Sequence, residues 1–227
     1  MTKREDSNGL ILVNKPRGLT SHDVVNYVRK KLNTKRVGHA GTLDPQAEGL
    51  LIILVGRYTK FFSRFVDFDK EYQGIMKLGE ATTTGDAQGE VVKRESVENL
   101  KESAVKEVFP SFVGEIEQVP PMVSAIRIGG KRLYKLARRG IVVERPPRKV
   151  KIYDLKILKI ELPFVEFYVR CSKGTYVRKL AEDIGEKLGC GAHITSIIRT
   201  AVGPFTLREA VNLEDISATH LREYTFE

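Results

Sequence analysis

The chain has 227 residues, of which 41% are hydrophobic and 30% charged, and these proportions are typical of a folded globular protein. Its two cysteines, Cys171 and Cys190, are too few for a disulfide framework or a four-cysteine zinc site, which indicates a reducing compartment such as the cytoplasm. The charged N-terminus lacks an apolar signal segment, and no apolar run reaches the roughly 20 residues that cross a bilayer. Secretion and membrane insertion are therefore not expected.

Apolar runs in the first half of the chain predict buried strands at residues 9–14, 50–55 and 72–78. A helix is expected to follow Thr20 or Ser21, either of which can cap its first turn. A second helix is expected over residues 58–66, with a core-facing stripe formed by Phe61, Phe62 and Phe65. The polar stretches between these elements are expected to be loops, at residues 33–45 and 82–89.

The second half of the chain predicts a helix over residues 96–109, before Pro110. Residues 150–160 and 165–171 alternate as two long strands that pair antiparallel, with Val165, Phe167, Val169 and Cys171 on one face. A helix at 176–188 and a strand at 194–198 follow. Because strands and helices do not alternate strictly, we predict an α+β fold, with a largely antiparallel mixed sheet flanked by helices. One catalytic domain is expected over residues 1–227.

The positive charge of the chain is concentrated in one segment. The formal net charge is +9. The segment from Arg127 to Lys151 contains ten lysines and arginines but only one acidic residue, Glu144. Proline pairs bracket this segment as an insertion at about residues 121–149. Such a concentration predicts a polyanion partner, most often nucleic acid. A merely solvated loop is the alternative, which the apolar residues among the cations disfavour.

Several common catalytic signatures are absent from the sequence. It contains no P-loop, no G-x-G-x-x-G after a strand and no H-E-x-x-H, so neither a cofactor nor a metal is expected. The spacing Cys190-x-x-His193 offers two ligands, whereas zinc needs three or four.

The densest polar group is Gly38–Pro45 (GHAGTLDP), just before the predicted central strand. Asp44 is held at a turn by Pro45, and His39 lies five residues before it. The glycines permit close approach of a ligand, so Asp44 is a candidate nucleophile or base. The alternative is an ordinary Asp-Pro turn.

Five segments together resemble the motifs of the TruB-type tRNA pseudouridine synthases. Gly38–Pro45 resembles the catalytic motif of that family. The other matches are Asn14–Ser21 (NKPRGLTS), Lys70–Tyr72 (KEY), Cys171–Arg178 (CSKGTYVR) and Gly191–Thr200 (GAHITSIIRT). They follow the order of the family and cover residues 9 to about 205, so the pseudouridine synthase fold is implied.

The resemblance implies an enzyme that flips uridine 55 out of the T-loop of tRNA, detaches the base and rejoins it through C5 to C1′. The implied catalytic residues are Asp44 as nucleophile or base, Tyr72 stacked on the base, and Arg178, which would pair with Asp44 and keep it ionised. A surface pair with Glu182 is the alternative for Arg178. The implied substrate-binding residues are His39, which would support the displaced stack, Lys15 and Pro16 at the floor of the site, and Ile197 in the base pocket.

The basic insertion occupies the place of the thumb-like loop of the family, which clasps the T-arm of tRNA. The implied RNA-binding residues are Arg127, Lys131, Arg132, Lys135, Arg138, Arg139, Arg148 and Lys149. The C-terminal RNA-binding extension of bacterial members is expected to be absent or trimmed. We expect a cytoplasmic monomer with no obligatory protein partner. Two alternatives remain: a catalytically silent RNA-binding protein or RNA chaperone, and a synthase that acts on other RNAs.

Overall fold

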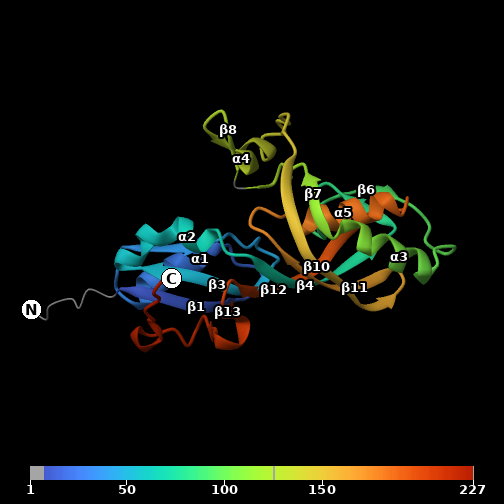
Figure 1. The fold of residues 1–227 in the computed structure, drawn as a ribbon. Coiled ribbons are helices and arrows are strands. Elements are labelled where there is room, and N and C mark those ends of the chain that lie inside the picture. Colours follow the sequence, from blue (N-terminus) through green and yellow to red (C-terminus); the bar gives the residue numbers. More distant parts are fainter. Residues whose placement is uncertain (1–7, 125, 227) are drawn as a thin grey trace, which may run out of the picture. The chain divides into compact units, whose positions relative to one another are not determined.

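The computed structural model describes residues 8–124 and 126–226. As predicted, the fold is α+β, with a large mixed sheet flanked by helices (Figure 1). The chain divides into two compact units. Unit 1 contains the residues up to Tyr72 and those from Ile197 onwards, and unit 2 contains Gln73–Ser196. Two strands, β4 (Lys70–Leu78) and β12 (Ala192–Val202), begin in one unit and end in the other.

The sheet of unit 1 is built around the apolar run at residues 50–55. Its strands follow the order β14 (Val211–Asn212), β1 (Gly9–Lys15), β3 (Glu48–Val55) and β12. β1 and β3 are antiparallel, whereas β12 is parallel to β3. Two strands extend this core: β2 (Val37–Ala40) pairs with β3, and β13 (Phe205–Thr206) pairs with β12.

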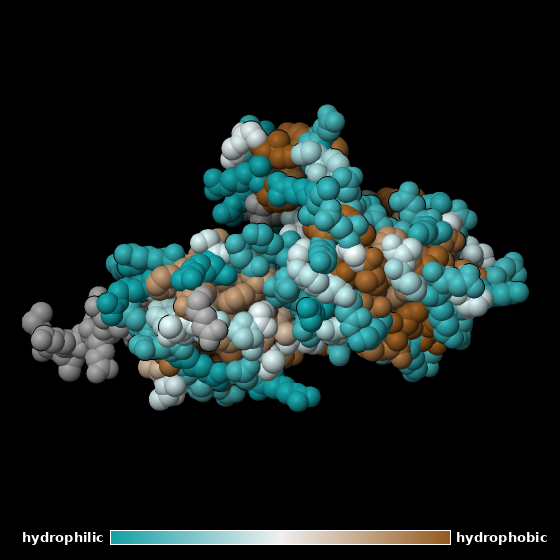
Figure 2. Space-filling model, viewed as in Figure 1, coloured by the Kyte–Doolittle hydropathy of each residue, from teal (hydrophilic) through white to brown (hydrophobic). Residues whose placement is uncertain are grey.

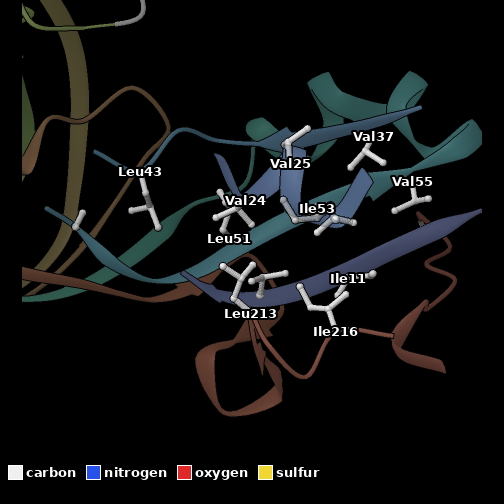
Figure 3. Close-up of a cluster of buried hydrophobic side chains, with 13 residues drawn as sticks. Ile11, Val24, Val25, Val37, Leu43, Leu51, Ile53, Val55, Leu213 and Ile216 are labelled. Atoms are coloured by element: carbon white, nitrogen blue, oxygen red, sulfur yellow. The ribbon is translucent and has the colours of Figure 1, made fainter. Parts of the chain in front are cut away.

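Both faces of this sheet are buried, which explains the continuous apolar runs at residues 10–13 of β1 and 50–55 of β3. One face carries Ile11 and Val13 and is covered by α1 (Ser21–Lys31), as Figure 3 shows for part of the cluster. The other face carries Leu10 and Leu12. It is closed by rings that contact one another, from Phe65, Phe68, Phe205, Tyr224 and Phe226.

The prediction for residues 58–66 is correct for one of the three phenylalanines and wrong for two. Phe65 is fully buried, whereas Phe61 and Phe62 are 39% and 49% exposed. The segment is not one helix, because a 3₁₀ helix, η1 (Gly56–Phe61), precedes the short α2 (Phe62–Val66). The change of period turns the three rings away from a common face.

In unit 2 the strands follow the order β12, β4, β11 (Phe164–Cys171), β10 (Arg148–Glu161) and β7 (Gly114–Gln118). The predicted antiparallel pairing of β10 and β11 is confirmed, with Leu155 opposite Val169. The predicted inner face of β11 is also confirmed, because its four side chains are at most 1% exposed. The longest helix of this unit, α5 (Val177–Lys187), follows β11.

Several predictions for polar segments are wrong. The helix expected at 96–109 is only α3 (Glu102–Val108), followed by the 3₁₀ helix η2 (Phe109–Phe112). The Ser96 hydroxyl accepts from the Glu98 amide at 3.3 Å, a local turn that competes with helix formation. Short strands lie in stretches for which no strand was predicted: β2, β5 (Glu80–Thr82), β6 (Val91–Arg94) and β7.

Candidate active site

Asp44 lies in the loop that joins β2 to β3 in unit 1. It is half-buried between the buried side chains of Leu43 and Ala47. The Asp44 carbonyl accepts a hydrogen bond from the Ala47 amide at 3.0 Å, which closes the turn that Pro45 begins. The carboxylate therefore stands on a closed turn immediately before the central strand.

The residue before Asp44 is held by α1. The Ser21 hydroxyl donates to the Leu43 carbonyl at 3.0 Å and accepts from the Leu43 amide at 2.8 Å. The N-cap of the helix is Thr20, whose side chain forms a capping box with Asp23. This settles which of the two hydroxyls caps the helix. Ser21 instead fixes the peptide groups next to Asp44, a role that sequence reasoning missed.

The residue after Asp44 is held by Lys15, at the end of β1. The Lys15 ammonium is fully buried and donates to the carbonyls of Leu19 at 2.7 Å, Pro16 at 2.9 Å and Pro45 at 3.4 Å. The Gly18 amide also donates to the Pro45 carbonyl, at 2.7 Å. Lys15 and Gly18 thus join the Asn14–Ser21 motif to the loop of Asp44.

Burial gives Lys15 an unusual acidity. Removal from water lowers the pKa of its ammonium from 10.5 to about 8. The carboxylates of Glu48 and Asp44 oppose this shift, because each favours the charged ammonium. Lys15 and Asp44 are therefore electrostatically coupled within unit 1.

Arg199 holds the start of the same loop from β12. Its guanidinium is buried and donates to three carbonyls: Leu50 at 2.8 Å, Gly41 at 3.0 Å and Thr42 at 3.4 Å. Arg199 lies in the Gly191–Thr200 motif, but the sequence predicted no role for this residue.

The aromatic and apolar residues predicted for the base pocket share one apolar cluster with Leu43. Tyr72 and Ile197 pack against this cluster as partly buried side chains. Figure 3 shows Leu43 at one end of it, away from Val37 and Val55. His39 lies on β2 opposite Ile53, and strand alternation places it on the same face as Val37. Unit 1 thus brings Tyr72, Ile197 and the loop of Asp44 to one side of its sheet.

Arg178 lies in unit 2, in the first turn of α5. Its side chain is buried, and its two terminal nitrogens donate to the carbonyls of Thr84 at 2.7 Å and Val123 at 2.9 Å. The Asp86 carboxylate lies 3.7 Å from the guanidinium. Glu182, the alternative partner, lies 3.5 Å from Lys179.

The basic insertion forms a small hairpin and helix in unit 2: β8 (Arg127–Ile128), β9 (Lys131–Arg132) and α4 (Leu133–Ala137). Leu133 and Leu136 are buried. The insertion is therefore folded, which disfavours the reading of a merely solvated loop. Figure 2 shows hydrophilic and hydrophobic residues side by side over β8 and α4.

The cations predicted to bind RNA are all exposed: Arg127, Lys131, Arg132, Lys135, Arg138, Arg139, Arg148 and Lys149. Two of them flank Tyr134. A hydrogen bond with Arg132 lowers the pKa of the phenol, and the Arg138 guanidinium lies 5.6 Å from the ring centre. Lys149 pairs with Glu115 at 3.0 Å. The insertion therefore presents exposed cations around an aromatic ring.

Residues 8–124 and 126–226 contain no cluster of three or more side chains suited to bind a metal. The Cys190 thiol lies 3.4 Å from the Gly191 carbonyl, and the His193 ring lies 3.1 Å from the Glu80 carbonyl. Within these same residues, no helix is both long enough and apolar enough to cross a membrane.

Comparison with known protein families gives two matches that together cover most of the chain. Residues 29–177 match the TruB family pseudouridylate synthase (N terminal domain), and residues 178–226 match the tRNA pseudouridylate synthase B C-terminal domain. A protein named tRNA pseudouridine synthase B from Clostridium tetani is 49% identical over 217 residues, which are 96% of this chain and 75% of that protein. One of the same name from Opitutus terrae is 46% identical, over 97% of this chain and 91% of that protein.

Solved structures give a consistent result. A chain in the crystal structure of a Cbf5-Nop10-Gar1 complex superposes with a TM-score of 0.73 at 33% identity, over 92% of this chain. A chain in the structure of an H/ACA RNP bound to a substrate RNA containing 2′-deoxyuridine superposes with a TM-score of 0.69 at 29% identity. The present chain spans 53% and 52% of those two chains.

Proposed function

Because the chain belongs to the TruB family of pseudouridylate synthases, we propose that it isomerises uridine to pseudouridine in tRNA, at uridine 55 of the T-loop. The relatives that carry the name tRNA pseudouridine synthase B align over nearly all of the chain, which supports the activity and the substrate class. The choice of uridine 55 rests on the resemblance of the five sequence motifs.

The reaction breaks the N1–C1′ bond of uridine and forms a C5–C1′ bond. The hydrogen on C5 leaves as a proton and N1 gains a proton, so the isomerisation balances without an oxidant or reductant. We propose Asp44 as the nucleophile or base of this reaction. The observation that carries this role is the loop of Asp44, where hydrogen bonds hold the peptide groups on both sides of the carboxylate.

The base must leave the helical stack of the RNA to reach Asp44, and flipping costs a few kcal/mol. We propose that Tyr72 stacks on the flipped base and that Ile197 lines its apolar pocket. Their shared packing against the cluster of Leu43 supports this assignment. His39 would fill the space that the base leaves, and Lys15 and Pro16 would shape the floor.

We propose Arg178 as the cation that keeps Asp44 ionised until it attacks or accepts a proton. Its burial and its two bonds to carbonyls support a fixed guanidinium rather than a mobile surface charge. The exposed cations of the basic insertion would neutralise phosphates of the T-arm, which adds affinity without base specificity. The protein would act as a cytoplasmic monomer, without an obligatory protein partner.

The decisive experiment follows tritium release from a T-arm transcript labelled at C5 of its uridines, because C5 loses its hydrogen in the isomerisation. We expect release by the wild type from the T-loop uridine alone. Asp44→Asn, which preserves the shape of the side chain, should abolish release while tRNA binding persists.

The matched control is Asp215→Asn, an exposed aspartate of unit 1, which should release tritium at the wild-type rate. Release by Asp44→Asn at that rate would remove Asp44 from its role. Tight RNA binding without release by the wild type would favour the silent RNA-binding protein. Release from other uridines would favour a synthase for other RNAs.

A further inference from the structure

Arg199 is a buried cation that the proposed chemistry does not use. Its side chain is only 1% exposed and is among the largest fully buried side chains of the described residues. A buried guanidinium must satisfy its donors, and here Nε, Nη1 and Nη2 all donate to backbone carbonyls. The side chain therefore stabilises the backbone around it through hydrogen bonds.

The three carbonyls lie on both sides of Asp44 in the chain. Gly41 and Thr42 precede the carboxylate, and Leu50 follows it on β3. One planar guanidinium thus ties the start of the loop to the strand that follows the loop. Hydrogen bonds from a charged donor are about twice as strong as neutral ones, so this link resists opening of the loop.

Two glycines, Gly41 and Gly49, lie against Arg199. Gly49 lies directly opposite Arg199 in the parallel pairing of β3 with β12, and it has a φ of +100°. A Cβ atom there would lie 2.4 Å from the Arg199 carbonyl oxygen. Gly41 has a φ of +89°, and a Cβ atom there would lie 3.5 Å from Nη1 of Arg199. β3 and β12 therefore approach closely at Gly49, and Gly41 adopts a left-handed backbone in contact with the guanidinium.

We propose that Arg199 is a positioning residue for the isomerisation: it fixes the approach to Asp44 so that the carboxylate meets the reacting nucleotide in a single geometry. This inference rests on the proposed function of Asp44. Lys15 binds Pro45 on the other side of the carboxylate, so buried cations hold the loop from two directions. Arg199 acts on the peptide groups and does not touch the substrate.

The test compares Arg199→Lys and Arg199→Met with Val202→Ala. Val202 lies on the same strand and is fully buried in the cluster that contains Phe65 and Phe205, so its truncation destabilises the fold through lost packing. Each variant is measured for its melting temperature, its Kd for a T-arm transcript and its single-turnover rate of tritium release at saturating enzyme, well below the lowest melting temperature.

For Arg199→Met we expect a rate about 100-fold below wild type, with a Kd within about twofold, because a displacement of about 1 Å costs this much in rate. Arg199→Lys retains the charge but presents one nitrogen in place of a planar fork, so it should recover only part of the rate. Val202→Ala should have a lower melting temperature than the wild type and react at the wild-type rate.

The proposal is overturned if both Arg199 variants react as fast as Val202→Ala, or if their loss lies in Kd alone. Should Arg199→Met fail to fold, Arg199→Lys decides the question by the same criteria. An inactive wild type would instead refute the proposed function, so the two failures remain distinguishable.

Discussion

At the scale of single residues, the site depends on contacts with backbone carbonyls. Lys15 and Arg199 both direct buried positive charge at carbonyl oxygens of the loop that carries Asp44. Ser21 satisfies both peptide groups of Leu43 with one hydroxyl. A carboxylate that must meet a flipped nucleobase has to stand on a rigid backbone.

The lowered pKa of Lys15 predicts a pH dependence of stability. Because its pKa is about 8 in the folded protein and 10.5 ordinarily, the unfolded chain binds more protons between these values. The free energy of unfolding should therefore rise with pH in this window, by at most about 1.4 kcal/mol per pH unit from this group. Well below pH 8 the ammonium is charged in both states, and the contribution no longer changes.

Denaturant unfolding at pH 7.5, 9 and 10 measures this effect in wild type and in Lys15→Met. The other lysines and the tyrosines titrate in both proteins, so they cancel in the comparison. The variant should show a shallower rise than the wild type between pH 8 and 10.5. Parallel curves would mean that burial does not shift this pKa.

Ser21 and Thr20 are neighbouring hydroxyls with different expected roles. Ser21→Ala removes the partner of both Leu43 peptide groups, so we expect a loss of about 1–3 kcal/mol in stability and a single-turnover rate about 10- to 100-fold lower. Thr20→Ala removes the N-cap and should cost about 1 kcal/mol with an unchanged rate. Denaturant unfolding and tritium release measure both, and equal rates for the two variants would contradict the role of Ser21.

At the scale of elements, β2 and β3 present the loop of Asp44, and β12 supplies the arginine that holds it. The parallel pairing places Arg199 opposite Gly49, so the strand register decides which carbonyls the guanidinium reaches. The basic insertion is a further element, with two buried leucines, Leu133 and Leu136, and an exposed surface of cations.

The insertion predicts a salt-dependent contribution to RNA binding. Replacing Arg138, Arg139 and Arg148 by glutamine should weaken binding to the T-arm and reduce the slope of log K against log salt by up to about 2–3, since each phosphate contact contributes about 0.7–0.9. The single-turnover rate at saturating enzyme should not change. Filter binding at several salt concentrations measures the slope.

The matched control replaces three exposed lysines of the same unit by glutamine, Lys93, Lys106 and Lys159. It removes the same charge from elsewhere in unit 2, so its slope should stay near that of the wild type. Equal slopes for the two triple variants would refute the assignment of the insertion.

At the scale of the whole molecule, the charge distribution agrees with the roles proposed for Asp44 and for the basic insertion. The net charge of +9 is matched by the excess of cations between Arg127 and Lys151. The proposed nucleophile and the residues that hold its loop belong to unit 1, whereas Arg178 and the insertion belong to unit 2. The proposed nucleophile and the greater part of the excess positive charge thus lie in different units of the chain.

The sequence by itself determined the long strands, the class of fold and the family. Continuous apolar runs and strict alternation are local signals, and five motifs in one order identify a family although each alone is weak. Prediction of secondary structure from the sequence failed where the hydrophobic pattern was weak or where the helical period changed. β2 is only four residues long and β7 is short and polar, and the shift from 3₁₀ to α-helix at Phe62 turned Phe61 and Phe62 outwards.

Only the tertiary structure decided how the loop of Asp44 is held. Ser21, Lys15 and Arg199 come from a helix and two strands that are distant in sequence from the loop, and their partners are backbone groups. Every residue carries a carbonyl, so no residue type marks the acceptor. Which carbonyl a buried cation reaches depends on strand register and packing, and these exist only in the folded chain.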